Sequence, residues 1–135
     1  MQILIDEGVR SVLIVEDEMI VAMMMEDLVR SLGAEDVYIC PDTASALDVI
    51  ATRALDCAVL DLRVLDGTTT SVADALAAKG VPFLFSSGTE LAEMEARHAD
   101  RPRIAKPFMD DDFKLIVLDT LTFGRSQPPL AVASD

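Results

Sequence analysis

Residues 56–61 read Asp-Cys-Ala-Val-Leu-Asp, and this stretch decides the fold. Cys57 to Leu60 form an apolar run without alternation, which is typical of a strand buried on both faces of a parallel sheet. The run ends on the carboxylate of Asp61. Ligands of open α/β sheets bind beyond the carboxyl ends of the strands, so Asp61 is the first candidate for the reacting residue.

Length and charge limit the possible classes of protein. The 135 residues suit a single domain, and a hydrophobic content of 51% is sufficient for one buried core. The formal net charge of −13 argues against direct binding to nucleic acid or to an anionic membrane, because both would repel the chain. A basic partner or a metal ion is compatible with this charge.

Location and redox state can also be predicted. Met1–Gly8 lacks the positive start of a signal peptide, and no apolar run is long enough to span a bilayer, so we expect a cytoplasmic protein. Cys40 and Cys57 are interpreted as small buried hydrophobes without a disulfide. His98, the only histidine, lies in a polar segment and is interpreted as a surface residue.

Strand signals alternate with helix signals along the chain. The expected strands are Ser11–Val15, Asp36–Cys40, Asp56–Leu60, Val81–Ser86 and Arg103–Ala105. The expected helices are Met19–Leu32, a helix capped by Asp42 that extends to Thr52, Thr69–Lys79, Thr89–His98, and a last helix from Asp110–Asp112 to Gly124. An N-terminal arm, 1–10, and a loose C-terminal tail, 126–135, flank the domain over 11–125.

This alternation predicts a doubly wound α/β fold. Short connections require parallel strands, right-handed crossovers and helices on both faces of the sheet. For five strands we expect the flavodoxin-like order 2-1-3-4-5, with its switch point between the first and third strands. Glu16 and Asp17 leave the first strand at this crevice, and Asp61 leaves the third strand beside them. Three carboxylates are therefore expected to converge.

Carboxylates held this close need a counter-charge. A hard divalent cation is the usual solution, and Mg²⁺ fits best because it accepts one or two carboxylates and takes phosphate oxygen as a further ligand. The alternative is that Glu16, Asp17 and Glu18 only cap the following helix, whose dipole favours negative charge. The matching positions of Asp61 and Lys106 at other strand ends favour the metal site.

Two further strand ends supply groups that suit a phosphoryl ligand. Ser87 follows the fourth strand with a hydroxyl that can donate to an oxyanion, and Lys106 follows the fifth with a mobile positive charge. A lysine before a proline is commonly a surface charge, and Ser-Ser-Gly is commonly a turn. The functional interpretation is favoured for both residues, because they stand at the same edge of the sheet as the three acids.

Four segments, in this order, resemble the receiver domain of two-component response regulators. They are Val-Leu-Ile-Val-Glu-Asp-Glu (12–18), Ala-Val-Leu-Asp-Leu-Arg (58–63), Pro-Phe-Leu-Phe-Ser-Ser-Gly (82–88) and Lys-Pro-Phe (106–108). The resemblance covers about Ser11 to Phe123. The stretch 73–88 is most similar to stand-alone receivers with a Phe-Ala-Thr-Gly type of fourth strand.

The resemblance implies a phosphoacceptor and a metal site. Asp61 would take a phosphoryl group from a phosphohistidine and hold it as an acyl phosphate. The Mg²⁺ would be bound by Glu16, Asp17, the Asp61 side chain and the main-chain carbonyl of Arg63. The partners would be a histidine kinase or a histidine phosphotransfer protein, and a downstream protein target. Such a protein is a phosphorylated binding module and not a turnover enzyme.

The resemblance also implies a switch. Ser87 would be the hydroxyl that moves toward the phosphoryl group, and alignment on Pro82 selects it over Ser86. Lys106 would contact the phosphate, and its peptide bond to Pro107 is expected to be cis.

Three features depart from the family pattern. Arg103 replaces the aromatic residue that usually stands three positions before the lysine, so some other residue must couple to the hydroxyl. The loop 61–67 is shorter than usual and lacks its common proline. The segment 88–103 leaves room only for an abbreviated or irregular fourth helix.

Two other functions are compatible with the sequence. A degenerate receiver would keep the fold and act as a scaffold without phosphorylation; the complete acid set argues against it, and Arg103 argues for it. An aspartyl phosphatase of the dehalogenase type needs a second acid two residues after the nucleophile, where this chain has Arg63.

Methionines cluster on the first expected helix. Helical spacing favours core positions for most of them, and a docking surface for a partner is the alternative. The residues are Met19, Met23, Met24 and Met25.

Overall fold

Five parallel strands form the central sheet. The computed structural model describes residues 9–88 and 96–125. The strands of the sheet are β1 (Ser11–Val15), β2 (Asp36–Cys40), β3 (Cys57–Asp61), β6 (Phe83–Ser87) and β7 (Arg103–Ala105). Their order, β2-β1-β3-β6-β7, is the predicted 2-1-3-4-5, so the doubly wound, flavodoxin-like fold is confirmed.

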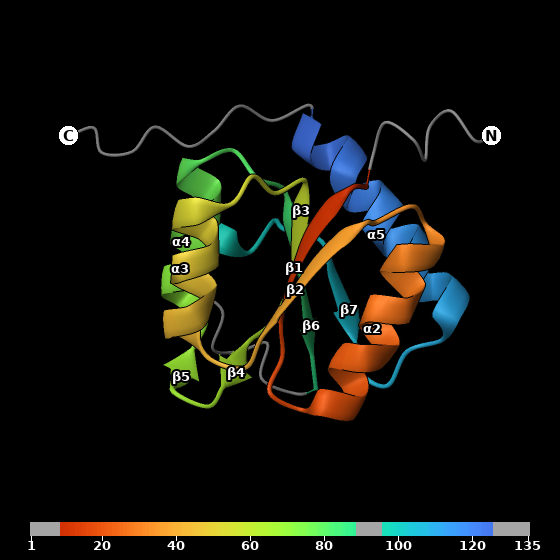
Figure 1. Ribbon diagram of the computed structural model, residues 1–135, viewed down its shortest axis with the longest axis horizontal. Helices are drawn as coiled ribbons and strands as arrows, with labels where there is room; N and C mark the ends of the chain where they lie inside the picture. The colour runs from red at the N-terminus through yellow and green to blue at the C-terminus, as the bar shows by residue number, and fades with distance from the viewer. Residues whose placement is uncertain (1–8, 89–95, 126–135) are drawn as a thin grey trace.

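Helices cover both faces of this sheet (Figure 1). One face carries α3 and α4, and the other carries α2 and α5. Their bounds are α2 (Met19–Ser31), α3 (Thr43–Thr52), α4 (Thr70–Ala78) and α5 (Asp110–Arg125), with a short 3₁₀ turn, η2 (Ala96–His98), before β7.

The two faces of the sheet bury separate hydrophobic clusters. Leu13 and Val15 of β1 pack with residues of α3 and α4, whereas Val12 and Ile14 pack with residues of α2 and α5. Full burial of such a side chain contributes about 1.5–3 kcal/mol. Because both faces of the central strand β3 are covered, its positions need apolar residues, which explains the uninterrupted run Cys57–Leu60.

Four strands end at the same edge of the sheet. In the ladder between β3 and β6, Asp61 pairs with Ser86, and between β6 and β7, Ser87 pairs with Ala105. Polar residues follow directly: Glu16 and Asp17 come after β1, and Lys106 comes after β7. The topology therefore brings the predicted site residues to one place.

The residues after β3 form a small hairpin, where the sequence indicated only a short loop. β4 (Arg63–Val64) pairs antiparallel with β5 (Gly67–Thr68), and Gly67 has a φ of 127°. The carboxylate of Asp66 accepts hydrogen bonds from the Thr43 backbone N–H at 2.8 Å and from its hydroxyl at 2.7 Å. Asp66 thus ties the hairpin to the start of α3.

The fourth strand and the last helix differ from their predicted bounds. The fourth strand begins at Phe83 and not at Val81, and it extends to Ser87. Pro82 has no N–H to donate, and only its carbonyl contributes, accepting from the Ala58 N–H at 3.1 Å. The last helix continues through Gly124, which was expected to end it.

Three expected segments lie partly or wholly outside the described residues. Of the expected helix Thr89–His98, only the turn η2 is described. Of the expected arm 1–10, Val9 and Arg10 are described, and Val9 is 1% exposed, packed in the cluster beneath α2 and α5. The tail 126–135 lies outside.

The methionines of α2 are mostly on the surface, so the preference for core positions is wrong for three of the four. Met19, Met23 and Met24 are 54%, 55% and 43% exposed, and only Met25 is buried. One methionine shares the inner stripe of the helix with a small and a branched residue. This stripe consists of Ala22, Met25 and Val29.

The expectations for the cysteines are confirmed. Cys40 and Cys57 are both buried and unpaired. Burial raises the pKa of the Cys57 thiol to about 12, which is consistent with an inert core residue.

In residues 9–88 and 96–125, no helix is long and apolar enough to cross a membrane.

Candidate functional site

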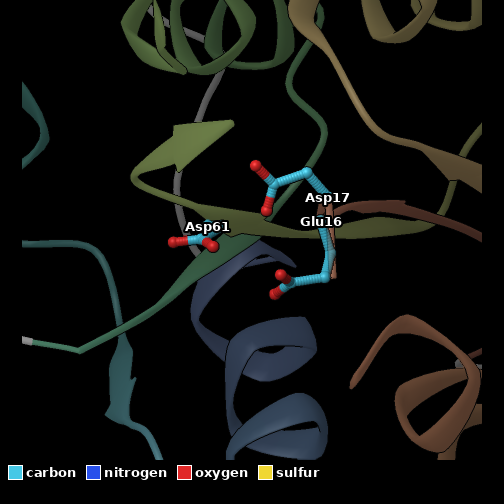
Figure 2. A group of neighbouring side chains, drawn as sticks. All are labelled: Glu16, Asp17 and Asp61. Atoms are coloured by element: carbon cyan, nitrogen blue, oxygen red, sulfur yellow. The ribbon is translucent and has the colours of Figure 1, made fainter. Parts of the chain in front are cut away.

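Three carboxylates converge at the carboxyl ends of β1 and β3. Glu16 and Asp17 follow β1, and Asp61 is the last residue of β3. Figure 2 shows their side chains grouped around one space, and one oxygen of each lies within 4.8 Å of the other two. With Lys106, these residues form what we call the acidic edge.

Lys106 supplies the positive charge of the acidic edge. Its Nζ lies 2.8 Å from Glu16 Oε1, 3.1 Å from Asp61 Oδ2 and 3.9 Å from Glu18 Oε1. Its backbone N–H donates to the Ser87 carbonyl at 2.8 Å, which fixes the start of the side chain against β6. The peptide bond to Pro107 is cis, as the sequence predicted.

Burial perturbs the ionisation of these groups. Desolvation raises the pKa values of both Asp61 and Glu16, and the charge and hydrogen bonds of Lys106 oppose this rise only in part. Desolvation also acts to lower the pKa of Lys106, but its hydrogen bond to Glu16 and the charge of Asp61 outweigh it, so that pKa is raised. The ammonium is therefore held in its charged form beside acids that lack sufficient counter-charge.

A divalent cation fits this donor set. Carboxylate oxygens are hard ligands, and three carboxylates within reach of one another carry more negative charge than a single lysine neutralises. Asp17, Glu18, Asp61, Arg63, Gly88 and Lys106 line an open cleft that leads to the acids. The backbone N–H of Arg63 hydrogen-bonds the Asp61 carboxylate, which orients this side chain in the cleft.

The capping interpretation of the acids is not supported. Glu18 occupies the N-cap of α2, yet its side chain makes no capping hydrogen bond, and no acid lies in the first turn. Glu16 is 1% exposed and faces Lys106. Its second oxygen accepts from the Glu18 N–H at 3.1 Å, which holds the carboxylate in place.

Two adjacent serines end β6, and strand alternation points them to opposite faces. Phe83 and Phe85 pack toward α3 and α4, so Ser87 stands on that face and Ser86 on the other. Both are buried. The Ser86 hydroxyl has no hydrogen-bond partner among the described residues.

One supporting residue was not found from the sequence. Thr69 is fully buried, and its hydroxyl donates to the main-chain carbonyl of Asp61 at 2.7 Å. This bond fixes the backbone that carries the carboxylate. A threonine just before the helix that follows Asp61 was the available signal, but it is equally typical of a helix cap.

His98 was predicted at the surface and is buried, with 1% of its area exposed. Its ring packs edge-on against Phe83 and Phe85, with centroid distances of 5.7 and 6.4 Å. Its Nε2 lies 2.8 Å from Asp74 Oδ1 on α4. The polar residues around it hid this position, because the contacts that bury it come from distant strands.

Comparison with solved structures decides the family. SdrG from Sphingomonas melonis Fr1 is 36% identical over 84% of this chain and 97% of its own, with a TM-score of 0.74. The receiver (REC) domain of the response regulator PhyR from Erythrobacter litoralis is 26% identical over 92% of this chain and 98% of its own, with a TM-score of 0.78. The chain belongs to the receiver domains of response regulators.

A more distant receiver shows the same fold. The receiver domain of the sensor histidine kinase PA1611 from Pseudomonas aeruginosa PAO1, described with a magnesium ion in its active-site cleft, is 21% identical. The match covers 85% of this chain and 99% of that domain, with a TM-score of 0.72. No family model and no curated protein matches the sequence.

Proposed function

We propose that this receiver is a single-domain response regulator that accepts a phosphoryl group on Asp61 and signals by binding other proteins in the cytoplasm. The observation that carries the proposal is the contact of Asp61 Oδ2 with Lys106 Nζ, 3.1 Å apart, in an open cleft beside Glu16 and Asp17. This arrangement offers a nucleophilic oxygen, a fixed positive charge and further oxygen ligands at one point.

The metal implied by this proposal is Mg²⁺. Asp17, Asp61, Glu16 and the main-chain carbonyl of Arg63 would hold it, and the PA1611 receiver is described with magnesium in its own active-site cleft. When bound, Mg²⁺ supplies positive charge that offsets the carboxylates and the oxygens of the phosphoryl group. The donor set of the acidic edge fits this ion, because all its side-chain ligands are carboxylate oxygens.

The residues of the chain then perform a simple displacement. An oxygen of Asp61 forms a bond to phosphorus while the bond between phosphorus and the nitrogen of phosphohistidine breaks, and its electron pair remains on the imidazole. Lys106 moves its charge from the carboxylate to an oxygen of the transferred group. The product is an acyl phosphate, and attack by water returns Asp61 and inorganic phosphate.

Ser87 would respond to the transferred group. Its hydroxyl can donate to an oxygen of the phosphoryl group, and its carbonyl already bonds the Lys106 N–H at 2.8 Å. A shift of Ser87 therefore also shifts the strand end that carries Lys106. Phosphorylation would favour one of two arrangements of the β6 and β7 ends.

An apolar surface beside the site suits docking of the phosphodonor. Val21, Met24, Pro107 and Phe108 line a hollow between α2 and the start of α5, with Glu18 and Lys106 at its rim. The exposed methionines of α2 extend this surface, and flexible thioethers adapt to a partner helix. The partner proposed for this surface is a histidine kinase or a histidine phosphotransfer protein.

Intact mass spectrometry after incubation with acetyl phosphate and Mg²⁺ tests the proposal. We expect one phosphoryl adduct on the wild type, complete loss of the adduct in Asp61→Asn, and an unchanged adduct in Asp119→Asn, which removes an exposed acid of α5. Absence of any adduct would favour the phosphorylation-independent scaffold. Sustained release of phosphate from esters would favour a hydrolase, although Arg63 stands where that chemistry needs a second acid.

A further inference from the structure

His98 packs on the face of β6 that also carries Ser87. Phe83, Phe85 and Ser87 alternate along β6 and share one face, and the His98 ring packs against both phenyl rings on that face. The switch hydroxyl of the proposed function therefore lies one strand repeat from the ring of Phe85, which contacts His98. Arg103, by contrast, is exposed, and its guanidinium donates to the carbonyl of Ala99.

Among the described residues, the buried imidazole makes one polar contact. His98 Nε2 lies 2.8 Å from Asp74 Oδ1, whereas Nδ1 is buried without a hydrogen-bond partner in the part of the chain that the structure describes. Because a carboxylate oxygen can only accept this hydrogen bond, Nε2 carries a proton. An unpaired buried nitrogen costs free energy, so the Nδ1 side of the ring adds no polar stabilisation to this position.

Asp74 does not depend on the histidine. Its side chain is 45% exposed, and its two oxygens accept hydrogen bonds from Arg97 at 2.8 and 2.9 Å. If the imidazole withdraws, the carboxylate keeps both bonds to Arg97 and gains water. Loss of the Asp74–His98 contact therefore leaves no new buried charge and keeps the ion pair of Asp74 with Arg97.

Short connections join this contact to the acidic edge. Arg101 stacks on the ring of Phe83, with Cζ 4.3 Å from the centroid, and the Pro102 carbonyl accepts from the Phe85 N–H at 3.0 Å. β7 follows at once and leads to Lys106. A change at Ser87 or Lys106 thus reaches His98 both through the rings of β6 and along the chain.

We propose that the Asp74–His98 hydrogen bond is a latch that is closed in the unphosphorylated protein and released when Asp61 is phosphorylated. The proposal rests on the proposed function. Movement of the Ser87 hydroxyl toward the phosphoryl group frees space on the face of β6 that bears Phe85. The phenyl ring and the imidazole follow inward, Nε2 leaves Asp74, and the surface formed by α4 and η2 changes for a partner. His98 acts here as a positioning residue.

Nitrogen NMR of the imidazole tests the latch directly, because the chain contains one histidine and its ring signals need no assignment. In the unphosphorylated protein we expect the Nε2–H tautomer with well-separated ¹⁵N signals. After acetyl phosphate and Mg²⁺, the two signals should move toward each other as the tautomers mix. Asp74→Ala should give the phosphorylated pattern without phosphate, and Asp119→Ala should keep the wild-type pattern.

Parallel mass spectra separate the two proposals. An adduct on Asp61 with unchanged imidazole signals overturns the latch and leaves the proposed function in place. Failure of Asp74→Ala to alter the signals also overturns the latch. Absence of the adduct overturns the proposed function, and the inference falls with it.

Discussion

The acidic edge and the Asp74–His98 latch are two polar regions of the same receiver that the chain builds in different ways. The acidic edge is made by residues at the ends of parallel strands of one sheet, so the sheet itself brings Glu16, Asp61 and Lys106 together. The latch joins a helix residue to a 3₁₀ turn 24 positions later in the chain, through contacts with rings of β6. Strand ends specify a site by topology, whereas the latch depends on tertiary packing alone.

The largest expected effect concerns the charge of the acidic edge. Lys106→Ala leaves Glu16 and Asp61 facing each other without their ammonium, and it removes the charge that would contact the phosphoryl oxygens. We expect phosphorylation by acetyl phosphate to slow by about 100-fold, the cost typical of losing one preorganised electrostatic group. The rate of adduct formation by mass spectrometry measures this.

Lys114→Ala serves as the matched control, because it removes a lysine of α5 outside the acidic edge. An unchanged rate in Lys106→Ala would contradict the assignment of this lysine to the reaction.

The second prediction compares His98 with Arg103, which stands where receiver domains usually carry an aromatic residue. His98→Ala removes a buried ring from the contacts with Phe83 and Phe85, and we expect a loss of about 2–3 kcal/mol in the free energy of unfolding. Arg103→Ala changes an exposed side chain and should cost no more than about 0.5 kcal/mol. Urea unfolding of both variants gives the comparison.

A loss in Arg103→Ala as large as that in His98→Ala would show that the exposed arginine stabilises the fold as much as the buried ring, and would contradict this prediction. His98→Phe refines the test, since it keeps a ring between the phenyl groups and removes the bond to Asp74 and the unpaired nitrogen together. Its stability should lie well above that of His98→Ala.

The difference between the two regions also explains how much the sequence could predict. Each strand of the sheet was recognisable from a short apolar run, and every residue of the acidic edge stands within two positions of a strand end. The fold and the convergence of the carboxylates with Lys106 could therefore be predicted before the structure. The local sequence pattern and the sheet topology were sufficient for these two predictions.

His98 and the methionines of α2 show where such reasoning stops. The neighbours of His98 in sequence are polar, and its burial comes from Phe83 and Phe85, which no local pattern connects to it. Met23 and Met24 have the same helical spacing as core residues, but Ala22 and Met25 face the sheet. Helical periodicity limits the possible inner faces and leaves the choice among them to packing.

The smallest expected effect is a difference in how stability depends on pH. Burial raises the pKa of Asp61 in the acidic edge, whereas hydrogen bonds lower the pKa of Asp74 in the latch. Desolvation raises the pKa of Asp61, so its folded form binds a proton more readily than the unfolded chain, and its ionisation destabilises the protein as pH rises above 3.8. The hydrogen bonds of Arg97, followed by that of His98, lower the pKa of Asp74. The stabilisation from Asp74 is complete above 3.8 and is lost as pH falls below it.

Thermal unfolding across pH 3 to 7 therefore distinguishes the contribution of Asp61 to stability from that of Asp74. Asp61→Asn should raise the melting temperature at pH 7 by about 2–4 °C, an effect that shrinks toward pH 3 as the wild-type carboxyl becomes protonated. Asp74→Asn should lower the melting temperature at pH 7, and this deficit should likewise shrink toward pH 3. If both variants shifted the melting temperature in the same direction at pH 7, burial of the Asp61 carboxylate would not destabilise the protein. Lys106 would then already neutralise the charge of Asp61 in the unphosphorylated receiver.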